Sequence, residues 1–342
     1  MSHKNPGYIY VIEEHDFLTG EPSGNVKIGI VKSPRVPADR LPEHQTGNSR
    51  ELSIASEYPA ESVSQAEALI HSRLSTKRLV QEWFVIDKSE QGEALADEIK
   101  LAICESDEIS SLREHVDKLS QRETKGKTRK PRDSELEAMT ELTGYLASIR
   151  ALELRQAAIR AELASKSKDA FGIEKVGHWT YSPPKPSFKE SKFKELDSAV
   201  YQSMMTAKVS GMLKLEVPKL SSPAKLSFPS ELERLCSEGT LIERTGYHED
   251  LHLKYLTDEE AISHLRTMAE RIQLQLAVSI GGFERIDGVG TWVRKPKEVL
   301  KTGYREDLRE THPKLFEACV SLGSASRGFD VTRFRSYPNS TF

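Results

Sequence analysis

The chain has 342 residues, of which 37% are hydrophobic and 30% charged, and a formal net charge of −3, which allows two or three polar domains with cores of their own. It contains no apolar run of 18 residues and no N-terminal signal pattern, so we expect no membrane span and no export. Three widely spaced cysteines argue against a disulfide framework or a zinc knuckle and for reduced thiols in the cytoplasm.

Residues 8–12 and 26–30 are rich in β-branched and aromatic side chains, which predicts two strands of a hairpin. Successive side chains of a strand point to opposite faces, so Tyr8 and Tyr10 share one face and Ile9 lies on the other. Lys27 of the second strand can meet the two phenols. We therefore expect an acid–base pocket on one face of this hairpin.

The elements that follow complete a small domain over residues 1–104. A proline-rich stretch after the hairpin leaves room for a turn or two of helix. Alternating and helical spacing of apolar residues then predicts a strand, a helix, a strand and a closing helix, at residues 52–56, 63–79, 83–86 and 92–104. The sequence predicts an α+β fold: an N-terminal domain with a mainly antiparallel sheet flanked by helices, then a mostly helical region with short β-hairpins.

Six short motifs follow one another in this domain: Tyr8-Ile9-Tyr10, Lys27-Ile28-Gly29, Arg40-Leu41, Thr46-Gly47-Asn48, the predicted helix Ala66-Glu67-Ala68-Leu69-Ile70-His71, and Glu82-Trp83-Phe84. In this order and spacing they resemble the GIY-YIG nuclease superfamily, in its phage-associated branch whose second motif reads Lys-Ile-Gly. The resemblance covers roughly the first 100 residues.

The resemblance implies an endonuclease that hydrolyses phosphodiester bonds in DNA with one divalent metal, Mg²⁺ or Mn²⁺. By motif, Tyr10 matches the tyrosine taken to be the general base and Glu67 the metal-binding glutamate. Lys27 stands where a second tyrosine is usual. Because a free phenol has a pKa of about 10, Lys27 is the expected cation beside Tyr10. Arg40 is the expected phosphate clamp, with Arg35 in reserve.

Several of these residues have a second interpretation. Ser64 and Glu67 have the spacing of a capping box, in which Glu67 only closes the helix start. A cap at Ser62 would give that role to Gln65 and free Glu67. We expect His71 to pack rather than to act in catalysis, and Trp83 and Phe84 to belong to the core; Glu82 has no assigned role.

The charge is divided unevenly along the chain. Residues 1–100 hold 11 Lys and Arg against 16 Asp and Glu, whereas residues 118–132 hold seven basic residues against Glu123. Since phosphate contacts dominate nucleic-acid affinity, the polar segment 105–133 is predicted to be a linker that binds DNA. Its candidate contacts are Lys125, Lys127, Arg129 and Lys130. The alternative is a solvated hinge.

A long helix is predicted from a capping box formed by Ser134 and Glu137. Its apolar stripe from Met139 to Leu163 must be covered. The partner is either a second copy of the chain, giving a homodimer through a coiled coil of residues 134–166, or an apolar helix near residues 258–280 of the same chain.

Two later stretches, residues 171–179 and 283–292, echo each other and are each followed by Pro-Lys. They predict two helix–hairpin–helix units, 134–235 and 236–342. The chain then closes on alternating arginines and aromatics, which either bind nucleic acid or dock on their own domain. These residues are Arg327, Phe329, Arg333, Phe334, Arg335 and Tyr337.

A second function fits the same sequence. The acidic first domain and the long remainder without a catalytic motif are compatible with a non-catalytic DNA-binding or protein-interaction module built on a degenerate nuclease domain. The sequence does not separate phage or mobile-element DNA processing from defence.

Overall fold

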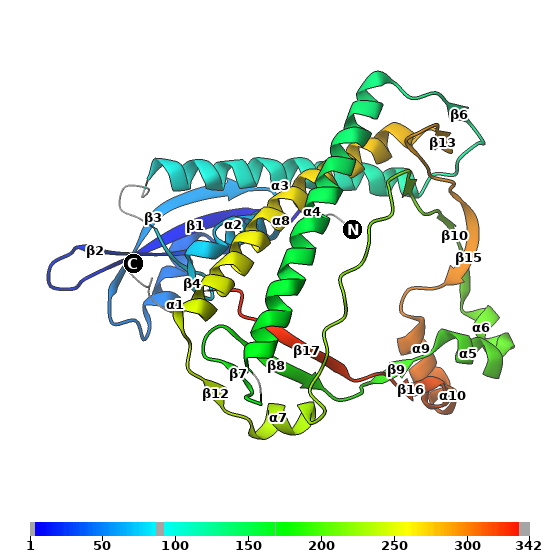
Figure 1. The fold of residues 1–342 in the computed structure, drawn as a ribbon. Helices are drawn as coiled ribbons and strands as arrows, with labels where there is room; N and C mark the ends of the chain where they lie inside the picture. The colour runs from blue at the N-terminus through cyan, green and yellow to red at the C-terminus, as the bar shows by residue number, and fades with distance from the viewer. Residues whose placement is uncertain (1–3, 87–91, 168, 335–342) are drawn as a thin grey trace.

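The computed structural model describes residues 4–86, 92–167 and 169–334. It confirms the α+β class: an N-terminal sheet domain is followed by a region built around two long helices (Figure 1). None of the helices in the described ranges is both long and apolar enough to cross a membrane.

The N-terminal domain is a five-stranded antiparallel sheet in the order β3-β1-β2-β5-β4. The predicted hairpin is present and longer than expected, with Tyr10 of β1 opposite Gly29 of β2. Side chains alternate as predicted: Ile9 packs in the core beneath the helices, and Tyr10 in a separate cluster on the other face. The strands are β1 (Gly7–His15), β2 (Pro22–Lys32), β3 (Glu51–Ala60), β4 (Arg78–Val80) and β5 (Trp83–Val85).

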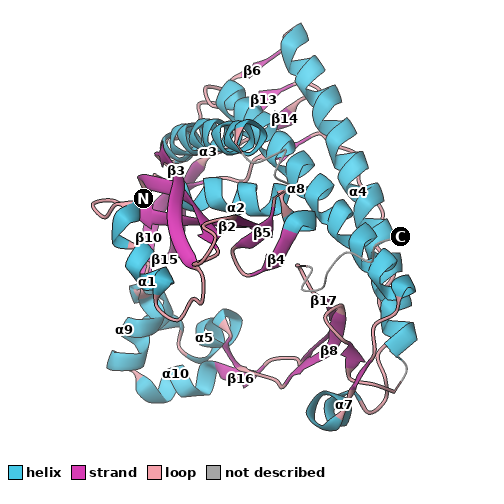
Figure 2. Ribbon diagram, turned by 90° about the vertical axis from the view of Figure 1, so that its left-hand side faces the viewer, coloured by secondary structure: helices cyan, strands magenta, loops and turns pink. Residues whose placement is uncertain are grey.

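Helices cover one face of this sheet, and a short helix lies after the hairpin (Figure 2). The prediction that the closing helix ends at Cys104 is wrong, because α3 continues to Ser120 through the first half of the expected linker. Its extension is held by a buried hydrogen bond from Ser62 Oγ to Ser110 Oγ of 2.7 Å. The helices are η1 (Pro37–Asp39), α1 (Leu41–Gln45), α2 (Val63–Arg73), η2 (Ser75–Lys77) and α3 (Glu93–Ser120).

The two long helices, α4 (Asp133–Ser167) and α8 (Gly246–Ile280), pack against each other. The apolar stripe of α4 meets α8, as the intramolecular alternative predicted: Met139, Leu142 and Ile149 share a core with Ile262 and Leu276. The predicted capping box is wrong in position. The helix begins two residues earlier than a Ser134 cap implies, at Asp133, and the Glu135 carboxylate accepts a hydrogen bond from the Arg132 backbone N–H at 2.9 Å.

The stretches that echo each other in sequence adopt the same structure. In each, a tryptophan backbone N–H closes the hairpin: Trp179 donates to Phe171 O at 2.9 Å, and Trp292 donates to Glu284 O at 2.8 Å. The first copy comprises β6 (Thr128–Arg129), α4, β7 (Gly172–Ile173), β8 (Gly177–Ser182), β9 (Pro186–Phe188), α5 (Glu190–Leu196), α6 (Ser198–Ser203), β10 (Met205–Ser210) and β11 (Lys214–Leu215). After α7 (Leu232–Glu238), the second comprises β12 (Leu241–Ile242), α8, β13 (Arg285–Ile286), β14 (Gly290–Thr291), β15 (Lys295–Leu300), α9 (Tyr304–Thr311), α10 (Pro313–Cys319), β16 (Val320–Leu322) and β17 (Ser326–Val331).

The two copies exchange strands. Antiparallel pairs join β10 to β15, β9 to β16, β11 to β14 and β8 to β17. Parallel pairs join β6 to β13 and β7 to β12. Each of these six pairs takes one strand from each copy, so the copies interlock into one body instead of forming two adjacent units.

The described part of the predicted tail docks within the chain, but on the first copy and not, as one of the two alternatives predicted, on its own unit. Strand β17 pairs with β8, and Phe329 is buried with its ring 5.2 Å from that of Trp179 in an edge-to-face contact. Arg327 lies over the ring of Tyr181. Arg335 and Tyr337 lie outside the described residues.

Candidate functional site

The phenol of Tyr10 lies across Gly29, on the face of the sheet that is not covered by α2 and α3. Tyr10 is only 1% exposed, and a Cβ atom at Gly29 would lie 2.6 Å from the phenol oxygen. No larger residue fits there while Tyr10 keeps its position. The close contact with Tyr10 therefore explains why a glycine stands at the third position of the Lys-Ile-Gly motif.

The sequence analysis missed His44, which forms the direct partner of Tyr10. The short helix α1 places His44 Nε2 2.9 Å from the Tyr10 hydroxyl. Burial lowers the pKa of His44, and the Lys27 charge lowers it further, so the neutral imidazole is favoured. A neutral His44 with Nε2 unprotonated accepts the phenol proton. The sequence feature that could have indicated His44 is its position one helical turn after Arg40.

Arg40 precedes α1 and lies beside Tyr10. Burial raises the pKa of Tyr10, and the Arg40 guanidinium offsets part of that rise. Arg40 also donates to the Glu43 carboxylate, which accepts a second bond from Arg35. Arg40 and Arg35, the two candidates for the phosphate clamp, thus share Glu43 as their acidic partner. A phosphate that binds either arginine has to replace Glu43.

Lys27 lies on the Tyr10 face but is engaged elsewhere. Its side chain is 8% exposed, and its Nζ donates to the Glu82 carboxylate. The expectation that Lys27 is the cation beside the Tyr10 phenol is corrected: Arg40 has that position. Burial alone would raise the pKa of Glu82, but the bond from Lys27 lowers it below the ordinary value. Glu82 thereby gains a role as the partner of Lys27.

Glu67 is free of the helix cap. Helix α2 has Ser62 at its N-cap position, and Gln65 accepts hydrogen bonds from Ser110 and Arg113. The Glu67 side chain forms no hydrogen bond or ion pair with another residue in the described ranges. Its pKa is raised to about 7, first by burial and then by the nearby charge of Glu82. Its carboxylate is therefore open to a ligand.

The remaining motif residues support the site from behind. His71 Nε2 lies 2.8 Å from Ile28 O, and its ring packs 5.2 Å from that of Phe84. Phe84 is fully buried and Trp83 packs beside the Tyr10 cluster, as expected. His71 thus holds the backbone next to Gly29.

The donor set limits which metal could bind. Among the described residues, no three His, Cys, Asp or Glu side chains gather in a metal-binding group. A half-buried carboxylate such as Glu67, beside a second one at Glu82, fits Mg²⁺ or Mn²⁺, which keep several water ligands.

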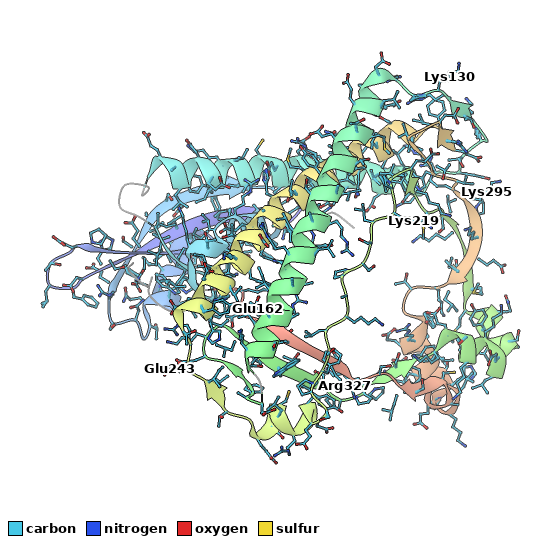
Figure 3. All side chains as sticks on the ribbon, viewed as in Figure 1. Lys130, Glu162, Lys219, Glu243, Lys295 and Arg327 are labelled. Atoms are coloured by element: carbon cyan, nitrogen blue, oxygen red, sulfur yellow. The ribbon has the colours of Figure 1, made fainter. Side chains whose placement is uncertain are left out.

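Lys130, the predicted DNA contact that Figure 3 labels, lies just before the N-terminal end of α4, away from the sheet domain. Lys125, Lys127 and Lys130 are exposed. The guanidinium of Arg129 binds both oxygens of Glu135, at 2.8 and 2.5 Å, and lies 4.9 Å from the Phe283 ring centre. Arg129 thereby holds the start of α4 in place, and its role as a phosphate contact stays a prediction.

Comparison with known proteins gives one match. No curated protein and no solved structure matches the chain significantly. Residues 7–100, which contain Tyr10, Lys27, Arg40 and Glu67, match the family model of the T5orf172 domain, a phage-associated domain of the nuclease-like group.

Proposed function

We propose that the N-terminal domain is a metal-dependent endonuclease of the GIY-YIG type that hydrolyses phosphodiester bonds in DNA. The observation that carries the proposal is the Tyr10–His44 hydrogen bond of 2.9 Å, set beside Arg40 and within the electrostatic reach of the Glu67 carboxylate. This is the set of groups that phosphodiester hydrolysis needs: a proton acceptor, a cation and a metal-binding carboxylate.

Tyr10 and His44 form a proton relay in this proposal. The attacking water gives its proton to the phenol oxygen as the phenol proton passes to His44 Nε2. The raised pKa of Tyr10 and the lowered pKa of His44 keep both groups neutral before the reaction. Arg40 exchanges Glu43 for a phosphate oxygen. Mg²⁺ or Mn²⁺ held by Glu67 would polarise the phosphate and stabilise the leaving oxygen.

Cleavage of supercoiled plasmid in Mg²⁺ or Mn²⁺ tests the site. We expect Glu67→Ala to abolish cleavage, and Tyr10→Phe and His44→Gln each to slow it by about 100-fold. If the two residues act as one relay, the double variant is no slower than either single variant. Glu51→Ala, opposite His15 at the far end of β1, and Tyr58→Phe, on the other face of the sheet, are matched controls outside the site and should cleave normally.

The outcome also decides between the two functions inferred from the sequence. Undiminished cleavage by Glu67→Ala and Tyr10→Phe would reject the site. A wild-type protein that binds DNA and cleaves none would favour the non-catalytic module, in which the Lys27–Glu82 and Arg40–Glu43 pairs are structural.

A further inference from the structure

The two-stranded ribbon of β10 and β15 stands apart from the other sheets. Among the described residues, no third strand joins it. Its central residues are exposed on both strands, Thr206, Ala207 and Lys208 on one and Lys295 to Glu298 on the other. The ribbon therefore presents two open faces, as Figure 1 shows at the right of the molecule.

One face of the ribbon is basic. The register places Lys208 opposite Lys297 and Ser210 opposite Lys295. Because side chains alternate, these residues share a face with Thr206 and Val299, while Glu298, the ribbon's only acidic residue, lies on the other. Like charges directly opposite each other destabilise a strand pair. None of the three lysines forms an ion pair within the part of the chain that the structure describes.

The other copy shows that the fold does not need these lysines. The equivalent ribbon pairs β9 with β16, and beyond its last pair Gly323 donates to Lys185 O at 2.9 Å. Gly323 and Lys185 thus occupy the places of Lys208 and Lys297. The second ribbon forms without a like-charge pair, so folding does not explain the pair in the first.

The basic face continues into the lysines after α3. The Thr124 backbone N–H donates to Arg294 O at 3.0 Å, and the Arg294 N–H donates to Thr124 Oγ1 at 3.1 Å. Lys125 and Lys295, the next residues, therefore lie at neighbouring positions. Figure 3 shows Lys130 and Lys295 at the same end of the molecule.

We propose that the β10–β15 ribbon binds the phosphate backbone of double-stranded DNA through Lys208, Lys295 and Lys297. The partner follows from charge: three lysines on one face of the ribbon, without ion-pair partners among the described residues, suit a polyanion, and a two-stranded ribbon fits a DNA groove. The first 100 residues, with 11 basic against 16 acidic residues, lack this affinity. The ribbon is a binding surface of its own and does not depend on the proposed catalysis.

The test is the salt dependence of binding. A fluorescein-labelled 30-base-pair duplex is titrated with full-length protein in EDTA, so that cleavage does not interfere. The triple variant Lys208→Gln, Lys295→Gln, Lys297→Gln should lower the slope of log affinity against log salt by about 0.9 for each lost contact, up to about 2.7. A control triple variant at Lys185, Lys254 and Lys314 removes the same charge elsewhere and should leave the slope unchanged.

Three outcomes would overturn the proposal. The ribbon variant could keep the wild-type slope, or the control variant could lower the slope as much as the ribbon variant does. The ribbon variant could also lose binding to anionic phospholipid vesicles while its binding to DNA stays intact. Circular dichroism and thermal unfolding check the fold, and removal of the Lys208–Lys297 repulsion should not lower stability. Plasmid cleavage at low salt, measured separately, tells failure of the ribbon from failure of the nuclease site.

Discussion

At the residue scale, the candidate site residues depend on neighbours that a motif does not reveal. Tyr10, Lys27, Arg40 and Glu67 were identified from the sequence, because each belongs to a short motif. His44 was not identified, because it meets Tyr10 only where the chain folds back onto the hairpin. Prolines on both sides of Arg40 also made it hard to predict the short helix that carries His44. Glu82 likewise gained a role only once Lys27 was seen to bind it.

The raised pKa of Glu67 makes stability depend on pH. In the fold its pKa is about 7, above the ordinary 4.5, so the fold favours the protonated acid. Its contribution to stability is complete below about pH 4.5 and is lost as the pH rises through 7. In EDTA, Glu67→Gln should be about as stable as the wild type at pH 4.5. At pH 8 it should be more stable by about 1–2 kcal/mol, once solvent screening of this partly exposed group is allowed for.

Urea unfolding at the two pH values measures this difference. Glu57→Gln, at an exposed position on the same sheet, serves as the control and should follow the wild type. Mg²⁺ at pH 8 should stabilise the wild type and not Glu67→Gln, if Glu67 holds the metal. Identical pH dependence in wild type and Glu67→Gln would contradict the raised pKa.

At the element scale, helix α3 shows why a polar sequence can still be packed. Its second half was predicted to be linker, since apolar spacing fades after Cys104. The buried face of that half is made largely of Ser106, Ile109 and Ser110, and serines carry no hydrophobic signal. Strand exchange was likewise not predictable, because strands of two to six residues pair over long sequence separations without local turn signals.

Arg294 joins the ends of two helices. It is 1% exposed, its Nη1 donates to Leu119 O of α3 at 2.5 Å, and its Nη2 donates to Gly281 O after α8. A cation at two helix C-termini also complements their dipoles. Arg294→Met should destabilise the protein by about 2–4 kcal/mol, because both carbonyls lose a charged donor.

Denaturant unfolding compares this variant with Arg285→Met. Arg285 is half exposed and pairs with Asp287 at the surface, so its loss should cost about 1 kcal/mol or less. Equal effects of the two substitutions would mean that Arg294 does not join the helices. Faster amide exchange at the end of α3 in Arg294→Met would localise the loss.

At the scale of the whole molecule, the N-terminal domain and the interlocked copies form one body. Helix α8 packs against both α2 and α3. Ser75 Oγ donates to Leu256 O at 3.2 Å, and Thr76 N–H donates to the Glu260 carboxylate at 2.5 Å. Helix α8 thus joins the sheet domain that carries the candidate site to the interlocked copies that carry the β10–β15 ribbon. If both proposals hold, this packing sets the direction from which DNA would reach Tyr10.

The same packing bears on assembly. The apolar stripe of α4 was expected to need either α8 or a second chain, and α8 covers it: Leu142 is fully buried between them. A homodimer through residues 134–166 would have to displace α8. We therefore predict a monomer of 38.5 kDa by light scattering of the full-length chain at micromolar concentration, unchanged from low to high salt.

Leu142→Asp separates the two arrangements. If α4 packs within the chain, the substitution should lower the unfolding temperature and leave the mass unchanged, because a buried charge disrupts the core. A wild-type mass near twice that of the chain, reduced to one chain by Leu142→Asp, would show that the stripe joins two protomers. A monomer carries one nuclease-like site, and one site addresses one strand at a time. Plasmid should then be nicked before it is linearised, with nicked circles accumulating at a rate proportional to protein concentration.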